Sequence, residues 1–150
     1  MEIERKFLIP CLPEGYDAHP FHQIEQAYLC TEPVVRIRQE DDSFYLTYKG
    51  KGLLSREEYN LPLTREAYAH LLPKADGVVL TKKRYLIPLD GSDDLTIELD
   101  VFEGRYAGLL LAEVEFTSEE EAMAFQAPEW FGRDVTFTRE YQNSRLACGK

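Results

Sequence analysis

A strict alternation of charged and apolar residues is the feature that most constrains the fold of this chain. The opening segment, EIERKFLI, places Glu2, Glu4 and Lys6 on one face and Ile3 and Phe7 on the other. A period of two residues is typical of a β-strand whose two faces meet different surroundings. The same pattern recurs within residues 26–29, 34–40, 43–50, 55–63, 81–89, 95–102 and 110–116. The sequence therefore predicts about eight strands, which is the range of a small closed barrel.

The sequence predicts few helices. Residues 64–72 are predicted to form a helix with Thr64 as its N-cap, because a threonine hydroxyl accepts a hydrogen bond from the first turn. Residues 118–127 are predicted to form another, with Ser118 and Glu121 in the spacing of a capping box. A weaker helical pattern covers residues 139–147. The predicted fold class is therefore α+β.

The charges on the polar face are segregated by sign from strand to strand. The clearest like-charged pairs are Arg36 with Arg38, Lys82 with Arg84, Glu98 with Asp100, and Glu113 with Glu115. The ordinary interpretation is an amphipathic strand with its charged face in water. Like charges side by side repel, however, so a bound partner would have to neutralise them. The alternative is a barrel with a charged interior, whose apolar outer face is covered by helices.

The cations of this face suit phosphate. The guanidinium of arginine matches phosphate oxygens as a planar fork, and the ammonium of lysine adds a point charge. The candidate phosphate-binding residues are Lys6, Arg36, Arg38, Lys49, Arg56, Lys82 and Arg84. A single phosphate would need only a few of them, so the set predicts a diphosphate or triphosphate.

The acids of the same face suit a hard divalent cation. Carboxylate oxygens are the ligands that Mg²⁺ and Mn²⁺ prefer. The candidate metal ligands are Glu2, Glu4, Glu98, Asp100, Glu113 and Glu115. An ion held there could bridge phosphate oxygens and lower the pKa of a bound water. Each acidic pair taken alone is equally well explained as a solvated strand edge.

Composition bounds the remaining possibilities. A chain of 150 residues that is 44% hydrophobic is expected to form one domain over residues 1–150. The formal net charge of −10 argues against general nucleic-acid binding. No long apolar run predicts a membrane span, and charges occupy the place of a signal-peptide core. The three cysteines have no metal-site spacing, so we expect reduced thiols and a cytoplasmic location.

An ordered set of motifs resembles the CYTH family, also called the triphosphate tunnel metalloenzymes, and in particular its small bacterial members. The motifs are ExExK at 2–6, RIR at 36–38, Lys49, RxE at 56–58, KxR at 82–84, ELD at 98–100, EVEF at 113–116 and YxN at 141–143. The resemblance implies an eight-stranded antiparallel β-barrel, with helices packed outside, that binds a triphosphate and divalent metal in its tunnel. The implied activity is hydrolysis of inorganic tripolyphosphate by water attack on a terminal phosphoryl group.

The resemblance also implies individual roles. It places Lys82, Glu4 and Asp100 in the catalytic apparatus, with Lys82 steadying or protonating the leaving oxygen. The substrate would be tripolyphosphate or an organic triphosphate, so a class IV adenylate cyclase and a thiamine or nucleoside triphosphatase stay open. A non-catalytic polyphosphate-binding module and a homodimeric assembly also stay open as alternatives. Asn60, Thr138 and Glu140 depart from the common pattern of the family, which leaves the contribution of the C-terminal helix undecided.

Overall fold

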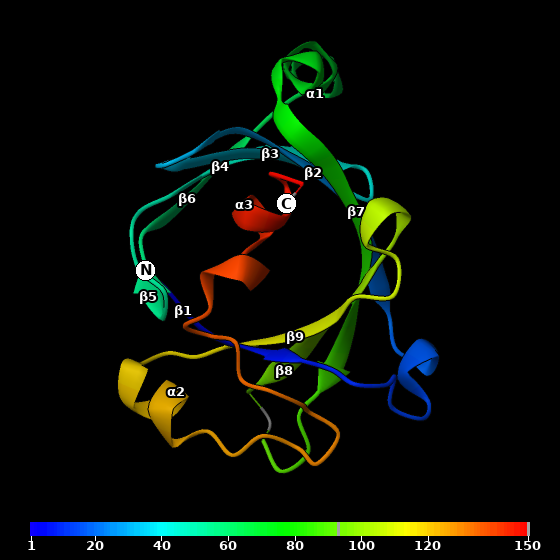
Figure 1. Ribbon diagram of the computed structural model, residues 1–150, viewed down its shortest axis with the longest axis vertical. Helices are drawn as coiled ribbons and strands as arrows, with labels where there is room; N and C mark the ends of the chain where they lie inside the picture. Colours follow the sequence, from blue (N-terminus) through cyan, green and yellow to red (C-terminus); the bar gives the residue numbers. More distant parts are fainter. Residues whose placement is uncertain (93, 150) are drawn as a thin grey trace.

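The strands of the protein form a single antiparallel sheet that curls into a ring (Figure 1). The computed structural model describes residues 1–92 and 94–149. Its strands are β1 (Glu2–Leu8), β2 (Phe21–Thr31), β3 (Val34–Glu40), β4 (Ser43–Lys49), β5 (Ser55–Arg56), β6 (Glu58–Pro62), β7 (Asp76–Pro88), β8 (Thr96–Phe102) and β9 (Leu110–Glu115). Their order in the sheet is β5-β1-β9-β8-β7-β2-β3-β4-β6.

The ring is closed by the segment that alternation predicted as one strand over residues 55–63. Its first part, β5, pairs with β1 and brings Arg56 opposite Glu2. Its second part, β6, pairs with β4 and brings Glu58 opposite Lys49. Only Glu57 separates the two ladders, so one short stretch of backbone joins both edges of the sheet. The barrel predicted from the sequence is confirmed, with nine strands because the closing strand is interrupted.

Two strands extend further than alternation predicted. β2 begins at Phe21 and β7 begins at Asp76, whereas the sequence patterns began near residues 26 and 81. The two extensions lie at opposite ends of the ladder between β2 and β7. Phe21 pairs with Tyr85 at one end, and Asp76 pairs with Tyr28 at the other. Pairing between neighbours therefore maintains strand geometry where the local pattern is irregular.

Two helices cover the outside of the ring, as predicted. α1 (Arg65–Leu71) begins after Thr64, whose hydroxyl accepts a hydrogen bond from the amide of Ala67 at 3.0 Å. Its Tyr68 is buried against outward-facing residues of β3 and β4. α2 (Glu119–Ala124) begins after Ser118, which accepts from the amide of Glu121 at 3.1 Å. Its Ala122 packs into the largest apolar cluster, beneath β1, β8 and β9.

The outer face of β6 is an exception to this covering. Tyr59 and Leu61 are 58% and 59% exposed, although both lie on the apolar side of their strand.

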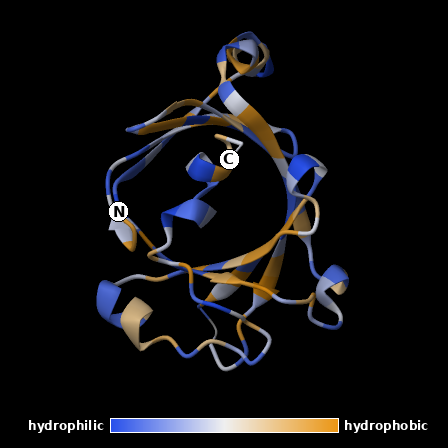
Figure 2. Cartoon of the chain, viewed as in Figure 1, coloured by the Kyte–Doolittle hydropathy of each residue, from blue (hydrophilic) through white to orange (hydrophobic). Residues whose placement is uncertain are grey.

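Hydrophilic and hydrophobic residues alternate along the strands of the ring (Figure 2), as expected for a sheet with one polar and one apolar face. No helix in the described part of the chain is both long and apolar enough to cross a lipid bilayer.

The C-terminal segment closes one end of the ring from within. It consists of the turn η4 (Arg139–Tyr141) and the short helix α3 (Asn143–Leu146), which lies across the opening in Figure 1. Leu146 and Ala147 are buried against inward-facing side chains of four strands: Tyr28, Leu80, Phe102 and Leu111. The hydroxyl of Tyr106 donates to the carbonyl of Leu146 at 2.6 Å. Apolar packing therefore seals one end of an otherwise charged interior.

Short 3₁₀ turns complete the connections between the elements. They are η1 (Tyr16–Ala18), η2 (Leu72–Lys74) and η3 (Gly104–Tyr106). Gly77, at the start of β7, has φ of +71° and lies where a Cβ atom would collide with the carbonyl of Ala147. A glycine at this position therefore allows the C-terminal segment to dock closely on β7.

Candidate active site

The inward face of the barrel surrounds a chamber of about 550 Å³. Its lining includes most of the charged residues that sequence analysis placed on the polar face. From that set the chamber is lined by Lys6, Arg36, Arg38, Lys49, Arg56, Arg84, Glu2, Glu4, Glu98, Glu113 and Glu115. The prediction that these side chains converge on one hollow is therefore confirmed, and the alternative of a solvated outer face is wrong for them.

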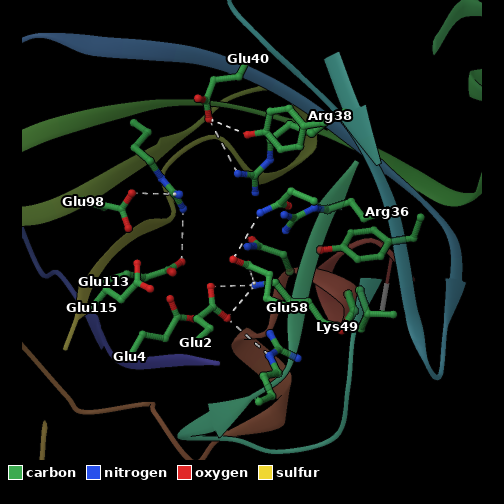
Figure 3. Close-up of a pocket in the computed structure, with 18 of the residues that line it drawn as sticks. Glu2, Glu4, Arg36, Arg38, Glu40, Lys49, Glu58, Glu98, Glu113 and Glu115 are labelled. Atoms are coloured by element: carbon green, nitrogen blue, oxygen red, sulfur yellow. Dashed lines mark hydrogen bonds and ion pairs between the residues drawn. The ribbon is translucent and has the colours of Figure 1, made fainter. Parts of the chain in front are cut away.

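The chamber has two walls of opposite charge. Figure 3 shows Arg36, Arg38 and Lys49, from β3 and β4, on one side. The opposite side carries the carboxylates of β1, β8 and β9: Glu2, Glu4, Glu98, Glu113 and Glu115. Each wall comes from neighbouring strands, because β3 pairs with β4, and β9 pairs with both β1 and β8. A ligand between the walls would meet cations on one side and carboxylates on the other.

The basic wall is held in position by uncharged polar side chains. The Nε and Nη2 atoms of Arg38 both donate to Oε1 of Gln26, at 2.9 and 2.6 Å. Arg36 donates from Nη2 to the hydroxyl of Thr47 at 3.4 Å, and that hydroxyl donates to Oδ1 of Asn60 at 2.6 Å. Burial and the nearby charge of Arg36 lower the pKa of Arg38. Two buried guanidinium groups facing one hollow therefore lack a full set of anionic partners.

Two further cations of the chamber, Lys49 and Arg56, contact carboxylates of β1 and β6. Lys49 lies 2.9 Å from Oε1 of Glu2 and 3.4 Å from Oε2 of Glu58. Arg56 lies 3.7 Å from Glu2. Burial opposes the charged form of Glu2, but its contact with Lys49 outweighs burial and lowers its pKa. These pairs neutralise Lys49 and Arg56, and a polyanion could replace the carboxylates as partner of the two cations.

Arg84 connects the chamber to a buried ion network behind it. Its Nε and Nη2 atoms donate to the two oxygens of Asp100 at 2.7 and 2.9 Å. Its other contacts are to Glu98 at 3.3 Å and Glu113 at 3.5 Å. Although burial opposes its charge, the carboxylate of Asp100 and then that of Glu98 raise the pKa of Arg84. The guanidinium therefore stays charged at the surface of the chamber.

Lys82 and Asp100 lie behind this network and do not line the chamber. Both are 0% exposed, and the ammonium of Lys82 donates to Oδ2 of Asp100 at 2.7 Å. Burial, which outweighs the attraction of Asp100, lowers the pKa of Lys82 to about 7. Lys82 and Asp100, which were both predicted to be catalytic, therefore do not line the cavity. Arg84 lines the cavity and donates hydrogen bonds to Asp100.

Two carboxylates of the acidic wall have no cationic partner among the ion pairs of the described residues. Glu4 and Glu115 lie directly opposite each other on β1 and β9. Burial, and then the negative charges of Glu113 and Glu2, raise the pKa of Glu4 well above its usual range. Burial and the charge of Glu2 also raise the pKa of Glu115. Carboxylates that resist ionisation for lack of a counter-charge are a donor set that suits a divalent cation.

The metal ligands predicted from the sequence are not gathered around one point. Within residues 1–92 and 94–149, no three acidic, histidine or cysteine side chains are arranged to hold a metal ion. Glu2, Glu98, Asp100 and Glu113 contact lysine or arginine instead. Although burial opposes its charge, Glu113 has a pKa held well below the usual range by Lys6 and Arg84. Cations therefore occupy four of the six predicted ligands in this structure.

Several lining residues were not among the predicted site residues. Glu40, Glu58 and Asn60 were given no role in the predicted site, and all three line the chamber. Asn143 and Ser144 of α3 line it as well, and Oδ1 of Asn143 is buried without a hydrogen-bond partner. The YxN motif at 141–143 was the available signal for this contribution. The C-terminal helix thus forms part of the chamber wall.

Comparison with known proteins gives three agreeing results. Residues 1–146 match the family model described as the CYTH domain. The chain is 40% identical to an inorganic triphosphatase of Nitrosomonas europaea, covering 97% of this chain and 96% of the relative, and 33% identical to one of Acetivibrio thermocellus, covering 97% and 92%. A crystal structure of an inorganic triphosphatase superposes with a TM-score of 0.73 at 36% identity, covering 99% of this chain and 95% of that one.

Proposed function

The chain belongs to the CYTH domain family, and from this premise we propose that it is a divalent-metal-dependent hydrolase of inorganic tripolyphosphate. Water would attack a terminal phosphoryl group, and the products would be diphosphate and orthophosphate. The relatives named inorganic triphosphatase, which match almost the whole chain, support this activity. The observation that carries the proposal is the chamber itself, where a basic wall faces an acidic wall across about 550 Å³.

The basic wall is proposed to hold the phosphates. Arg36 and Arg38 are 4% and 6% exposed, so their guanidinium groups give up little further hydration when a phosphate binds. Gln26 and Thr47 fix the directions of these two guanidinium groups. Positioning of this kind lowers the entropy lost on binding. The other proposed phosphate-binding residues are Lys6, Lys49, Arg56 and Arg84.

Arg84 is proposed to stabilise charge that develops during phosphoryl transfer. Its guanidinium already has a fixed direction, because Asp100 accepts two hydrogen bonds from it. Fixed charges aimed at a developing charge are effective in a site that excludes water. The Lys82–Asp100 pair supports this arrangement from behind. Direct contact between Lys82 and the leaving oxygen, as the resemblance implies, stays a prediction that requires Lys82 to reach past Asp100.

The acidic wall is proposed to hold Mg²⁺ or Mn²⁺. Glu4 and Glu115 are the best supported ligands, because each lacks a cationic partner in the described part of the chain and each has a raised pKa. Glu2, Glu98 and Glu113 could join them once a polyanion engages the cations that now hold them. A bound divalent cation would polarise phosphoryl oxygens and lower the pKa of a coordinated water. Asp100 is the weakest candidate, since both of its oxygens are engaged by Lys82 and Arg84.

Phosphate release from a substrate panel tests the proposal. Tripolyphosphate, ATP and thiamine triphosphate would each be offered with Mg²⁺, with Mn²⁺ and with a chelator. We expect the highest kcat/KM with tripolyphosphate and no turnover in the chelator. Cyclic AMP formed from ATP would indicate the cyclase instead. Tight binding of tripolyphosphate without turnover in either metal would indicate a binding module and would reject the hydrolase.

A further inference from the structure

A second cavity lies at the sealed end of the barrel, outside the chamber. It has a volume of about 360 Å³ and is bounded by the β2–β3 turn, the loop from β4 to β5, and the C-terminal segment. We call it the basic cleft, because its charged lining residues are Lys51, Arg56, Arg139, Arg145 and Glu32. Four cations and one carboxylate surround this hollow in a chain whose formal net charge is −10.

The cations of the basic cleft are largely uncompensated. Lys51, Arg139 and Arg145 take part in none of the ion pairs found among residues 1–92 and 94–149. Their side chains also make no hydrogen bond to the described residues that would use up their donors. They come from two distant parts of the sequence, since Lys51 precedes β5, whereas Arg139 lies in η4 and Arg145 in α3. Folding thus brings like charges together around a concave surface, which favours an anion between them.

The basic cleft adjoins the chamber, because Val34, Arg56 and Ser144 line both cavities. A small cavity of about 10 Å³ lies between them and is lined by Lys6, Leu53, Arg56 and Gln142, among others. Leu53, Arg56 and Gln142 also line the cleft, and Lys6 and Arg56 also line the chamber. A space of that size holds about one water molecule. The cleft nevertheless has cations of its own, because Lys51, Arg139 and Arg145 line it and do not line the chamber.

We infer that the basic cleft binds a phosphate group independently of the chamber. Arginine suits this ligand, because its planar guanidinium pairs with two phosphate oxygens at once. The phosphate group could belong to free orthophosphate or to the end of a longer polyphosphate chain. The proposed function would release orthophosphate beside this site, but binding in the cleft does not require hydrolysis.

Arg56 gives the cleft a means of influencing the chamber. Its side chain lines both cavities, and its Nε atom lies 3.7 Å from Glu2. An anion in the cleft would compete with Glu2 for this guanidinium. Occupancy of the cleft should therefore weaken the contact between Arg56 and Glu2 and change the apparent affinity of the chamber for its own ligand.

Calorimetric titration with inorganic phosphate, in a chelator that prevents turnover, tests the inference. The test variant is Arg139→Gln/Arg145→Gln, which removes two exposed cations of the cleft. The matched control is Lys74→Gln/Lys83→Gln, which removes two cations that line neither cavity. We expect the test variant to lose one phosphate-binding event, or to bind phosphate in the basic cleft about ten-fold more weakly than the parent protein. The control variant should titrate like the parent protein.

A second arm of the experiment identifies the source of the phosphate group. A long-chain polyphosphate replaces orthophosphate, and circular dichroism checks that every variant is folded. Loss of affinity for orthophosphate in the test variant assigns the site to the free anion, and loss confined to the long chain assigns it to a chain end. Equal titrations of the parent and the test variant with both ligands would overturn the inference. Because turnover is not measured, failure of the proposed hydrolase activity would not affect this result.

Discussion

The ammonium of Lys82 lies 2.7 Å from Oδ2 of Asp100, and neither side chain is exposed to solvent. Asp100 also accepts two hydrogen bonds from Arg84, so one carboxylate joins two cations in the interior of the barrel. A buried carboxylate with two cationic partners stays ionised, and the pKa of Asp100 is lowered although burial opposes its charge. Arg84 alone of the three lines the chamber, so in this conformation Lys82 would act on a bound substrate through its charge and through its support of Asp100 and Arg84, without direct contact.

Replacement of Lys82 by alanine should lower turnover more than it weakens substrate binding. We expect kcat to fall about 100-fold, because an electrostatic group that acts on developing charge is lost, while KM changes little. Steady-state kinetics with tripolyphosphate measures both. Lys83→Ala, at the neighbouring position on the opposite face of β7, is the matched control. Equal losses in kcat and in substrate affinity would contradict a role confined to the transition state.

The lowered pKa of Lys82 predicts a pH dependence of stability. The folded protein binds this proton only below a pKa of about 7, whereas an unfolded lysine holds it up to about 10.5. Between these values the unfolded state binds more protons, so the free energy of unfolding should rise with pH, by up to about 1.4 kcal/mol per pH unit from this group. Denaturant unfolding of the parent and of Lys82→Met measures the difference. A parallel slope in both proteins would show that Lys82 is charged in the folded state.

Replacement of Glu4 by glutamine should abolish metal-dependent hydrolysis and leave the fold intact. Burial and the charges of Glu113 and Glu2 favour the neutral form of Glu4, so a neutral amide of the same shape should be tolerated. We expect an unchanged melting temperature and a loss of at least about 100-fold in activity at saturating Mg²⁺ or Mn²⁺. Glu66→Gln, on exposed α1, is the control. Unaltered activity and metal titration would remove Glu4 from the metal site.

Gln26 is predicted to affect substrate binding through Arg38. Its Oε1 atom accepts two hydrogen bonds from that guanidinium, and Gln26 is fully buried. The variant Gln26→Leu removes the acceptor, so Arg38 loses its fixed direction, and we expect KM for tripolyphosphate to rise about ten-fold with a smaller change in kcat. Gln39→Leu, on the other face of β3, serves as the comparison. A KM equal to that of the parent would show that Arg38 is positioned without Gln26.

Leu146 is predicted to account for much of the stability of the sealed end. Its side chain is 6% exposed and packs among inward-facing apolar residues. Leu146→Ala should lower the free energy of unfolding by about 2–4 kcal/mol, because it removes buried apolar surface and leaves a cavity. Cys148→Ala, at an exposed position two residues later, should change it by less than about 0.5 kcal/mol. Similar melting temperatures for both variants would indicate that the segment contributes little to the closed end.

Alternation along single strands was sufficient to predict which residues share a face. Arg36, Arg38 and Glu113 were assigned to the polar side from their spacing alone, and all three line the chamber. The inward direction of that side followed from the segregation of like charges, since such pairs are unfavourable on an open surface. The number of strands predicted a closed barrel and the family resemblance implied the same fold, although no local pattern states that two sheet edges meet.

The sequence by itself determined the two-faced strands and the residues on each face, since successive side chains of a regular strand point to opposite faces. Tertiary structure alone decided how deep each charge lies and which opposite charge it meets. Lys82 and Arg84 share a face, yet only Arg84 reaches the chamber, because α3 and the apolar side chains around it fill the end of the barrel. The basic cleft depends in the same way on contact between the loop after β4 and the C-terminal segment. Such depth and pairing arise from the packing of residues far apart in the chain, which a pattern read over a few residues does not contain.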